Sequence, residues 1–273
     1  MKNAIVRRKA KKVNLSVIVI AKNEELKIYE CLKSASKYAD EIVLVDSGSM
    51  DKTVQIAKGF FAKVLELKNG SYSDWRNAGL KIALGKWIFY LDADERLTDD
   101  LGEEILGIIK SEDKSLPKAY AVPRRNFILG KEMRYGGQWP DYQKRFFLKK
   151  SLIGYKNDLH EEPVYKGELG YLTNPIIHLK HDNLTDMVTK TNKWSLIEAK
   201  MLYEAKHPKM VWWRFLRIMF SELIFRMIVQ KSYKDGIEGI IYAIYQMWSK
   251  FFTYAKLWEL QIVNEKVNES RNL

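Results

Sequence analysis

Strand-like segments that alternate with helix-like segments are the feature of this sequence that most constrains its fold. Four segments rich in β-branched and aromatic residues occur in the first third of the chain, at residues 15–21, 41–49, 62–67 and 86–91. Three segments with apolar residues at helical spacing separate them. Apolar strands that alternate with helices are typical of a parallel sheet that crossover helices bury on both faces. The sequence therefore predicts an α/β fold with a mixed, mainly parallel sheet flanked by helices.

The rest of the chain changes in character twice. Residues 119–181 hold several short strand-like runs separated by Gly, Pro and Asn, which we expect to extend the sheet with antiparallel strands. Apolar segments with helical spacing follow at 210–229 and 240–263. With 273 residues, 47% of them hydrophobic, the chain can form one large domain with an appendage. We expect four parts: a basic tail (1–13), two halves of one domain (14–115 and 116–185) and a C-terminal helical region (186–273).

Acidic and amide side chains follow three of the predicted strands, at the point where each strand ends. They are Asn23 and Glu24 after the first, Asp46 after the second, and Asp92, Asp94 and Glu95 after the fourth. Ligands of open α/β sheets bind outside the carboxyl ends of the strands. Carboxylates gathered there repel one another unless a cation or hydrogen-bond donors lie between them, and Mg²⁺ or Mn²⁺ often bridges carboxylates to phosphates. The pattern indicates a nucleoside-diphosphate ligand, although an Asp-x-Asp also occurs in solvated turns and Asp46 can cap its own turn.

Three motifs in this region resemble the nucleotide-binding half of family 2 glycosyltransferases. They are SVIVIAKNEE (16–25), EIVLVDSGSMDKT (41–53) and WRNAGLKIALGKWIFYLDADE (75–95). A weaker likeness continues in GGQWPDYQKRFF (136–147), LHEE (159–162) and HLKHDN (178–183). The chain is most similar to the branch that includes lipopolysaccharide core glucosyltransferases. The resemblance implies a GT-A, Rossmann-like fold with a C-terminal helical extension.

The resemblance also implies roles for individual residues of the first half, 14–115. Nucleotide-sugar binding would fall to Asn23, Glu24, Asp46, Arg76, Asn77, Asp92 and Asp94. A divalent metal, Mg²⁺ or Mn²⁺, would bind Asp94. In this fold a later histidine can complete the metal site, and we favour His181 over His178 for that position.

The second half, 116–185, is expected to bind the acceptor and to supply a base. The family motif His-Glu selects His160 and Glu161, with Glu161 as the general base of an inverting displacement; the alternative is a polar strand entry without a catalytic part. Trp139 and Tyr142 are suited to stack on a sugar ring, but each is also compatible with an aromatic at the edge of the core. In the same stretch Asp141 can bond hydroxyl groups and Arg145 can meet phosphate.

Charge and cysteine content bear on location. The formal net charge of +12 favours an anionic partner, and the single Cys31 with no evident secretory signal favours the cytoplasm. Segment 210–229 is apolar, but Arg214, Arg217, Glu222 and Arg226 interrupt it. It suits a helix lying at the inner face of a membrane, or a helix packed on the domain or on a second subunit.

These observations and the family resemblance predict a metal-assisted glycosyltransferase, and the resemblance alone implies inversion at the anomeric carbon. Its donor would be a nucleoside-diphosphate sugar, with a UDP-sugar favoured, and its acceptor a glycan or glycolipid such as lipopolysaccharide core. A sugar nucleotidyltransferase is an alternative, but it would need a Gly-rich, basic loop where the chain has AKNEE (21–25). A nonenzymatic nucleic-acid- or membrane-binding protein is a third, although the acidic sheet edge argues against nucleic acid.

Overall fold

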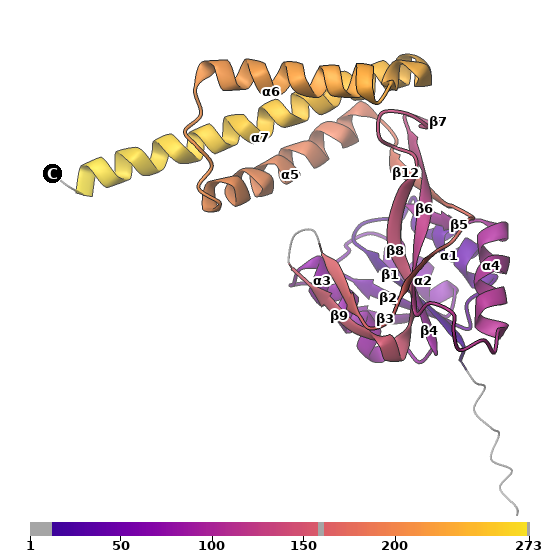
Figure 1. Ribbon diagram of the computed structural model, residues 1–273. Helices are drawn as coiled ribbons and strands as arrows, with labels where there is room; N and C mark the ends of the chain where they lie inside the picture. Colours follow the sequence, from indigo (N-terminus) through magenta and orange to yellow (C-terminus); the bar gives the residue numbers. More distant parts are fainter. Residues whose placement is uncertain (1–12, 158–160, 272–273) are drawn as a thin grey trace, which may run out of the picture. The chain divides into compact units, whose positions relative to one another are not determined.

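The computed structural model describes residues 13–157 and 161–271, with side chains as far as Val263. These residues form two compact units. The first holds the described residues up to Arg124 together with those of Tyr142–His178, and the second holds Arg125–Asp141 and the residues from Leu179 onward. Figure 1 labels the helices and strands of both units.

The four predicted strand segments form the parallel part of one sheet in the first unit (Figure 1). In sheet order these strands are β3 (Lys63–Glu66), β2 (Glu41–Asp46), β1 (Leu15–Ala21) and β4 (Trp87–Asp92). The helices between them are α1 (Ile28–Ser36), α2 (Thr53–Gly59) and α3 (Tyr72–Ile82). The predicted alternation of strands and helices is confirmed.

The core of the first unit lies on both faces of this sheet. Val17 and Val19 of β1 belong to one buried cluster, together with Cys31 and Leu32 of α1. Ile18, the residue between the two valines, belongs to a second cluster that includes partly buried residues of α3. Alternate residues of a strand point to opposite faces, so a strand covered on both sides is apolar at nearly every position; in β1 only Ser16 is polar.

Further strands and one helix complete the first unit, to which all their residues belong except Asp141. They are β5 (Glu95–Leu97), α4 (Asp99–Lys110), β8 (Asp141–Leu148), β9 (Leu152–Lys156), β10 (Glu162–Tyr165) and β11 (Leu169–Tyr171). A 3-10 turn (Lys149–Ser151) joins β8 to β9. β8 pairs antiparallel with β4, with Phe89 opposite Phe146, and so brings Arg145 to the carboxyl end of β4. The predicted antiparallel extension of the sheet is confirmed.

Two strands begin in the first unit and end in the second. They are β6 (Ala119–Ile128) and β12 (Ile176–His181), and the short β7 (Lys131–Glu132) pairs with β6. Consequently residues 116–185, which we expect to be one half of a domain, are divided between the units. The four-part division of the chain stays a prediction.

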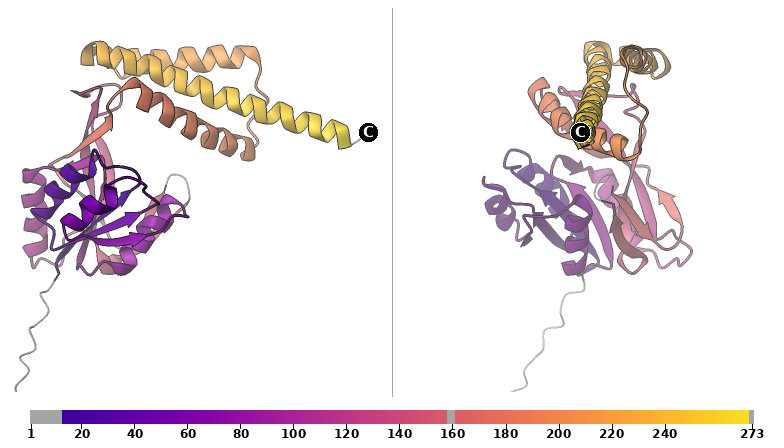
Figure 2. Two further views of the ribbon diagram at one scale, coloured as in Figure 1. Left: turned by 180° about the vertical axis from the view of Figure 1, so that it is seen from behind. Right: turned by 90° about the vertical axis from the view of Figure 1, so that its left-hand side faces the viewer.

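Helices make up most of the second unit. They are α5 (Leu184–Glu204), α6 (Trp212–Ile224), a π-helical segment (Phe225–Val229), a 3-10 turn (Ser232–Asp235) and α7 (Gly236–Arg271). The long α7 packs against both α5 and α6 and lies between them (Figure 2). Met187 and Tyr242 belong to one buried cluster, and Ala199, Met210 and Leu257 form another. Among the described residues, no helix is both long enough and apolar enough to cross a membrane.

Candidate active site

Arginines neutralise the acidic end of β4. Nη2 of Arg145 contacts Oδ2 of Asp92 and lies 2.8 Å from Oε1 of Glu95. Nη2 of Arg76, on α3, lies 3.2 Å from Oδ1 of Asp92. Both arginines are almost fully buried, with 4% and 5% of their surface exposed. The hydrogen-bond donors that so many carboxylates require therefore come from the protein itself.

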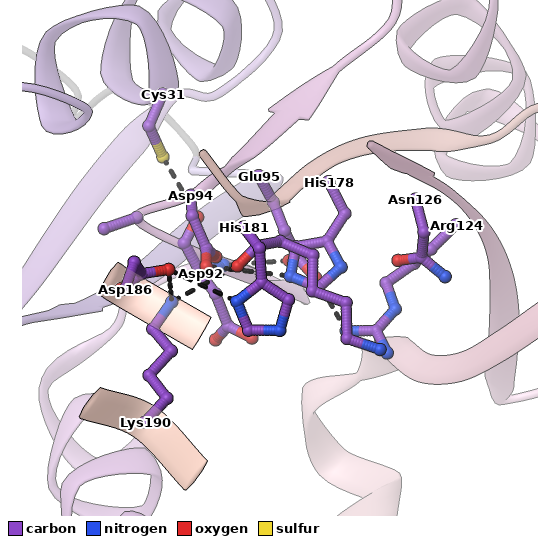
Figure 3. Close-up of polar contacts among 12 residues, drawn as sticks. Cys31, Asp92, Asp94, Glu95, Arg124, Asn126, His178, His181, Asp186 and Lys190 are labelled. Carbon is purple, nitrogen blue, oxygen red and sulfur yellow. Dashed lines mark hydrogen bonds and ion pairs between the residues drawn. The ribbon is translucent and has the colours of Figure 1, made fainter. Parts of the chain in front are cut away.

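Glu95 is the most deeply placed of these carboxylates. It is fully buried, and Arg124 Nη1 lies 3.3 Å from the same Oε1 that Arg145 contacts. Its other oxygen accepts a hydrogen bond of 2.9 Å from the backbone N–H of Asp92. Glu95 thus fixes the turn between β4 and β5 and holds the guanidinium groups of Arg145 and Arg124 in place. Glu95 and Arg124 are labelled in Figure 3.

The charge state of Asp92 follows from these contacts. Burial alone would raise the pKa of Asp92, but the guanidinium groups of Arg145 and Arg76 outweigh it and lower that pKa below its ordinary value. Asp92 is therefore a permanent anion at neutral pH.

A polar cavity of about 320 Å³ opens beside Asp92. Arg76, Asp92 and Arg145 line it together with Glu161. Nη2 and Nε of Arg76 lie 3.1 and 3.3 Å from Oε1 of Glu161, so one arginine connects the strand-end carboxylate to the predicted base. His160, the other predicted catalytic residue, lies outside the described residues.

Arg76 is held rigidly by aromatic rings. Its guanidinium carbon lies 5.3 Å from the ring centroid of Tyr90 and 5.4 Å from that of Tyr155, and the Tyr90 hydroxyl donates to the Arg76 carbonyl. Such stacking suits a planar guanidinium and fixes the direction of its donors. Burial raises the pKa of Tyr155 to about 12, so this tyrosine is neutral at physiological pH.

Asp94 has a histidine neighbour. Nε2 of His178, on β12, lies 3.6 Å from Oδ2 of Asp94, because β12 pairs antiparallel with β5 and sets His178 opposite Glu95 (Figure 3). His181 belongs to the second unit, where its Nδ1 lies 3.2 Å from Asp186. Among the described residues no group of three or more His, Cys, Asp or Glu side chains is close enough to hold a metal ion. A divalent cation that also binds phosphate needs only one or two protein ligands, which Asp94 and His178 can supply.

The predicted nucleotide contacts after β1 and β2 form a hydrogen-bonded pair of turns. The Asp46 carboxylate accepts from the backbone N–H groups of Gly48 and Ser49, at 3.1 and 3.0 Å, and from the Ser49 hydroxyl. Asn23 accepts from the N–H of Met50, and the N–H of Glu24 donates to Thr53. Asp46 therefore caps its own turn, and its contact with a base or ribose stays a prediction.

Asn77 bridges α3 to β9. Its amide donates to the carbonyl of Tyr155 at 2.9 Å and accepts from the N–H of Tyr155 at 2.7 Å. Both polar groups of this side chain are engaged, so the structure gives Asn77 a positioning role beside the cavity, and a direct nucleotide contact stays a prediction.

The predicted acceptor residues fall in different places. Tyr142 lines the cavity, and its ring meets that of Tyr171 edge to face. Arg145 lines the cavity but is 5% exposed and pairs with Asp92 and Glu95, because β8 lies directly beside β4; its contact with an acceptor stays a prediction. Trp139 and Asp141 belong to the second unit, where Asp141 accepts from the Asn126 amide at 3.0 Å.

A larger cavity, of about 610 Å³, lies between α5 and α7 in the second unit. Its walls are mainly apolar, with Ile244, Trp248 and Phe252 among them, and they include no carboxylate, histidine, lysine or arginine. The chemistry of group transfer needs such residues, so the smaller polar cavity is the candidate active site.

The family model described as "Glycosyl transferase family 2" matches residues 16–165, more than half of the chain. The chain belongs to family 2 of the glycosyltransferases. The residues matched include β1 to β4, the cavity and Glu161. The resemblance inferred from three motifs is thus confirmed, and the protein is a transferase with the GT-A fold.

Curated relatives cover nearly the whole of this glycosyltransferase. "Uncharacterized glycosyltransferase RT0209" of Rickettsia typhi is 26% identical, with 94% of this chain and 91% of the relative aligned. "Lipopolysaccharide core biosynthesis glycosyltransferase LpsC" of Rhizobium meliloti is 28% identical over 94% of this chain and 96% of its own. Among solved structures, S. aureus TarS 1-349 in complex with UDP-GlcNAc has a TM-score of 0.47 and 16% identity, covering 84% of this chain and 79% of that chain.

Sequence reasoning missed several residues that line the cavity of this glycosyltransferase, and Arg124 and Tyr155 are the two with contacts to its charged groups. Arg124 follows a buried run of β6, and the adjacent pair Arg124-Arg125 in a strand was the only available signal. No local sequence pattern indicates Tyr155, because only the packing of α3 against β9 places its ring against Arg76.

Proposed function

We propose that this family 2 glycosyltransferase moves a sugar, with inversion at the anomeric carbon, from a nucleoside-diphosphate sugar to a glycan or glycolipid. A UDP-sugar is the first donor to test. The observation that carries the proposal is the cavity in which Arg76 contacts both Asp92 and Glu161. Lipopolysaccharide core is the acceptor we favour, because the LpsC relative is named for its biosynthesis and aligns over almost its full length.

Donor binding would use the cavity walls. Nη1 of Arg76 is buried and has no hydrogen-bond partner among the described residues, so this arginine has more donor capacity than its carboxylate partners use. Asp92, fixed as an anion, can accept from ribose hydroxyls. The turns that hold Asn23, Glu24 and Asp46 lie at the ends of β1 and β2, where ligands of such sheets bind. We assign base and ribose contacts to these turns.

Glu161 would act as the general base. Within the described part of the chain its Oε1 accepts from Arg76 and its Oε2 accepts no hydrogen bond, which leaves Oε2 to take a proton. In the displacement, the acceptor oxygen forms a bond to the anomeric carbon while the bond from that carbon to the diphosphate oxygen breaks. The acceptor's hydroxyl proton passes to Glu161, and the diphosphate leaves with the electron pair of the broken bond.

The carboxylate and imidazole at Asp94 and His178 fit a divalent metal. Mg²⁺ or Mn²⁺ bound there would neutralise the charge that develops on the leaving diphosphate. The geometry supports His178 in this role in place of the predicted His181, since His178 shares the first unit with Asp94.

Acceptor recognition and location complete the proposal. Tyr142, about half exposed in the cavity wall, can stack on an acceptor sugar, and we keep Trp139 and Asp141 as further candidates. An acceptor carried on a lipid would place the enzyme at the inner face of the cell membrane, as a peripheral protein.

Calorimetry on the full chain tests the donor site. The protein is titrated with UDP, GDP, ADP and CMP and with their sugars, each with and without Mn²⁺. We expect one nucleotide to bind in a metal-dependent way, and Asp94→Ala to lose that dependence with the fold intact. In a separate assay of sugar transfer, the same variant should lose at least about a hundredfold in turnover. Asp113→Ala, which removes an exposed carboxylate from the loop after α4, is the control. If no nucleotide binds and nucleic acid binds in a salt-sensitive way, the proposal is wrong.

A further inference from the structure

Helix α6 and the π-helical segment after it expose a long apolar face. Of the ten exposed residues between Trp212 and Val229, eight are apolar, and only Arg217 and Ser221 are not. Trp213, Leu216, Phe220 and Ile224 follow one another at intervals of three and four residues and therefore share one side of the helix. They are 43%, 49%, 59% and 52% exposed. We refer to these four residues as the α6 outer face.

The opposite side of α6 is already used for packing. Phe215 and Ile218 pack against the buried cluster of Ala199, Met210 and Leu257. The core of the second unit thus accounts for the inner side of the helix but not for the outer face. A helix that is apolar on both sides normally has both sides buried, so the outer face indicates a binding surface.

The segment that carries the outer face has an excess of positive charge. Between residues 206 and 234 the chain has seven basic side chains and one acidic side chain: Lys206, Lys209, Arg214, Arg217, Arg226, Lys231 and Lys234 against Glu222. Glu222 is occupied, because its Oε1 lies 2.7 Å from Nε of Arg226. The guanidinium carbons of Arg214 and Arg217 lie 5.3 and 5.5 Å from the ring centroid of Trp213. An aromatic flanked by cations in this way suits the boundary between lipid headgroups and acyl chains.

We propose that the α6 outer face binds the surface of an anionic lipid bilayer, with the helix in the plane of the interface. Apolar side chains would enter the headgroup boundary while exposed cations of the segment, Arg217 among them, meet lipid phosphates. A second copy of the chain is a poorer occupant, because its own α6 would bring the same excess of cations against this one. The proposal gives the peripheral location of the proposed function a physical basis, and it rests on that function only for the claim that the acceptor is carried on a lipid.

Vesicle sedimentation of the full chain tests this proposal without donor or metal. Wild-type protein is mixed with phosphatidylcholine vesicles, with or without phosphatidylglycerol. We expect it to sediment with the anionic vesicles and to be released by salt. The double variant Leu216→Ala/Phe220→Ala should lower the partition constant roughly tenfold or more, because it removes apolar area that enters the interface. Arg217→Gln should weaken binding by about threefold to tenfold on anionic vesicles only.

A matched control separates the outer face from general hydrophobicity. Leu26→Ala/Phe61→Ala removes the same two side-chain types from sites in the first unit that are 92% and 97% exposed, and it should leave sedimentation unchanged. Circular dichroism and thermal unfolding confirm that each variant folds. Equal sedimentation of wild type and the α6 variant would overturn the proposal, as would absence of wild-type binding to anionic vesicles. A third outcome would also overturn it: light scattering shows that the wild type is a dimer and the α6 variant a monomer, while both bind vesicles equally.

Calorimetry on the Leu216→Ala/Phe220→Ala variant distinguishes this proposal from the proposed function. Calorimetric donor binding by the α6 variant should match wild type, since the outer face is remote in sequence from every cavity residue. A protein that binds a nucleotide sugar but no vesicle retains the transferase proposal and loses this one. A protein that binds anionic vesicles but no nucleotide sugar retains this proposal and contradicts the assigned donor site.

Discussion

The two units of this glycosyltransferase use charge and apolar surface in opposite ways. The first unit buries Arg76, Arg145 and Glu95 and pairs each of them with an opposite charge. In the second unit, aromatic and aliphatic side chains of α6 stay exposed. Both arrangements are unfavourable in isolation, since burying charge costs desolvation and exposing apolar area forgoes burial.

The comparison indicates what each unit is built to meet. Buried charges that are already paired and fixed in direction suit a small, highly charged ligand, because no reorganisation is then needed when it binds. An exposed apolar face with cations around it suits an extended surface that is apolar within and anionic outside.

Glu161→Gln removes the proposed base while keeping its size. We expect turnover to fall by about 10²–10⁴-fold with donor affinity little changed, because an amide cannot take the acceptor's proton. The measurement is steady-state sugar transfer together with calorimetric donor binding. Glu162→Gln is the control, since Glu162 lines the same cavity one position along. A similar loss in both variants would indicate that these carboxylates act through charge alone.

Glu95→Gln tests the buried charge of the first unit. The change leaves Arg124 and Arg145 with one carboxylate fewer in a fully buried place, and we expect the free energy of unfolding to fall by about 3 kcal/mol. Denaturant unfolding measures it, with Glu103→Gln on the exposed side of α4 as the control. A loss below about 1 kcal/mol would mean that water relieves the arginines and that the network is less dry than its burial indicates.

Variants of the two histidines of β12 test which of them binds the metal. We expect His178→Ala to weaken Mn²⁺-dependent donor binding at least about tenfold, because loss of a proposed ligand should cost no less than loss of a residue that orients one. His181→Ala should leave metal dependence unchanged and lower stability by about 1–2 kcal/mol, because it removes the contact with Asp186 from a buried side chain. Calorimetry with and without Mn²⁺, and thermal unfolding, measure the two effects. The opposite outcome would return the ligand role to His181.

Features of the site that lie within a single strand and the residues after it could be predicted from the sequence. The apolar run of β4 followed by Asp92 and Asp94 indicates both a buried strand and a ligand at its carboxyl end. The alternation of strands and helices likewise fixes the parallel sheet, since each element carries its own periodicity.

The part that depends on pairing between distant strands could not be predicted. Arg145 stands in a stretch with two glycines and exposed aromatics, and only the register of β8 against β4 shows that it meets Asp92. The same holds for His178 and His181, because the register of β12 against β5 decides which one lies beside Asp94. The alternation of side chains within a strand shows which residues share a face, but not which residue of a distant strand lies opposite each of them.

Phe220→Gln gives the smallest expected effect and tests the second unit. If the α6 outer face is not part of the protein's own core, replacing an exposed phenylalanine should change the free energy of unfolding by no more than about 0.5 kcal/mol. Denaturant unfolding at two protein concentrations measures it.

Phe215→Gln is the matched change on the inner side of the same helix. It should lower the free energy of unfolding by about 3 kcal/mol, since Phe215 packs on the cluster around Leu257. Equal losses for the two phenylalanines, larger at higher protein concentration, would mean that a second copy buries the outer face. The contrast between a unit that buries charge and a unit that exposes apolar surface would then hold only for the isolated chain.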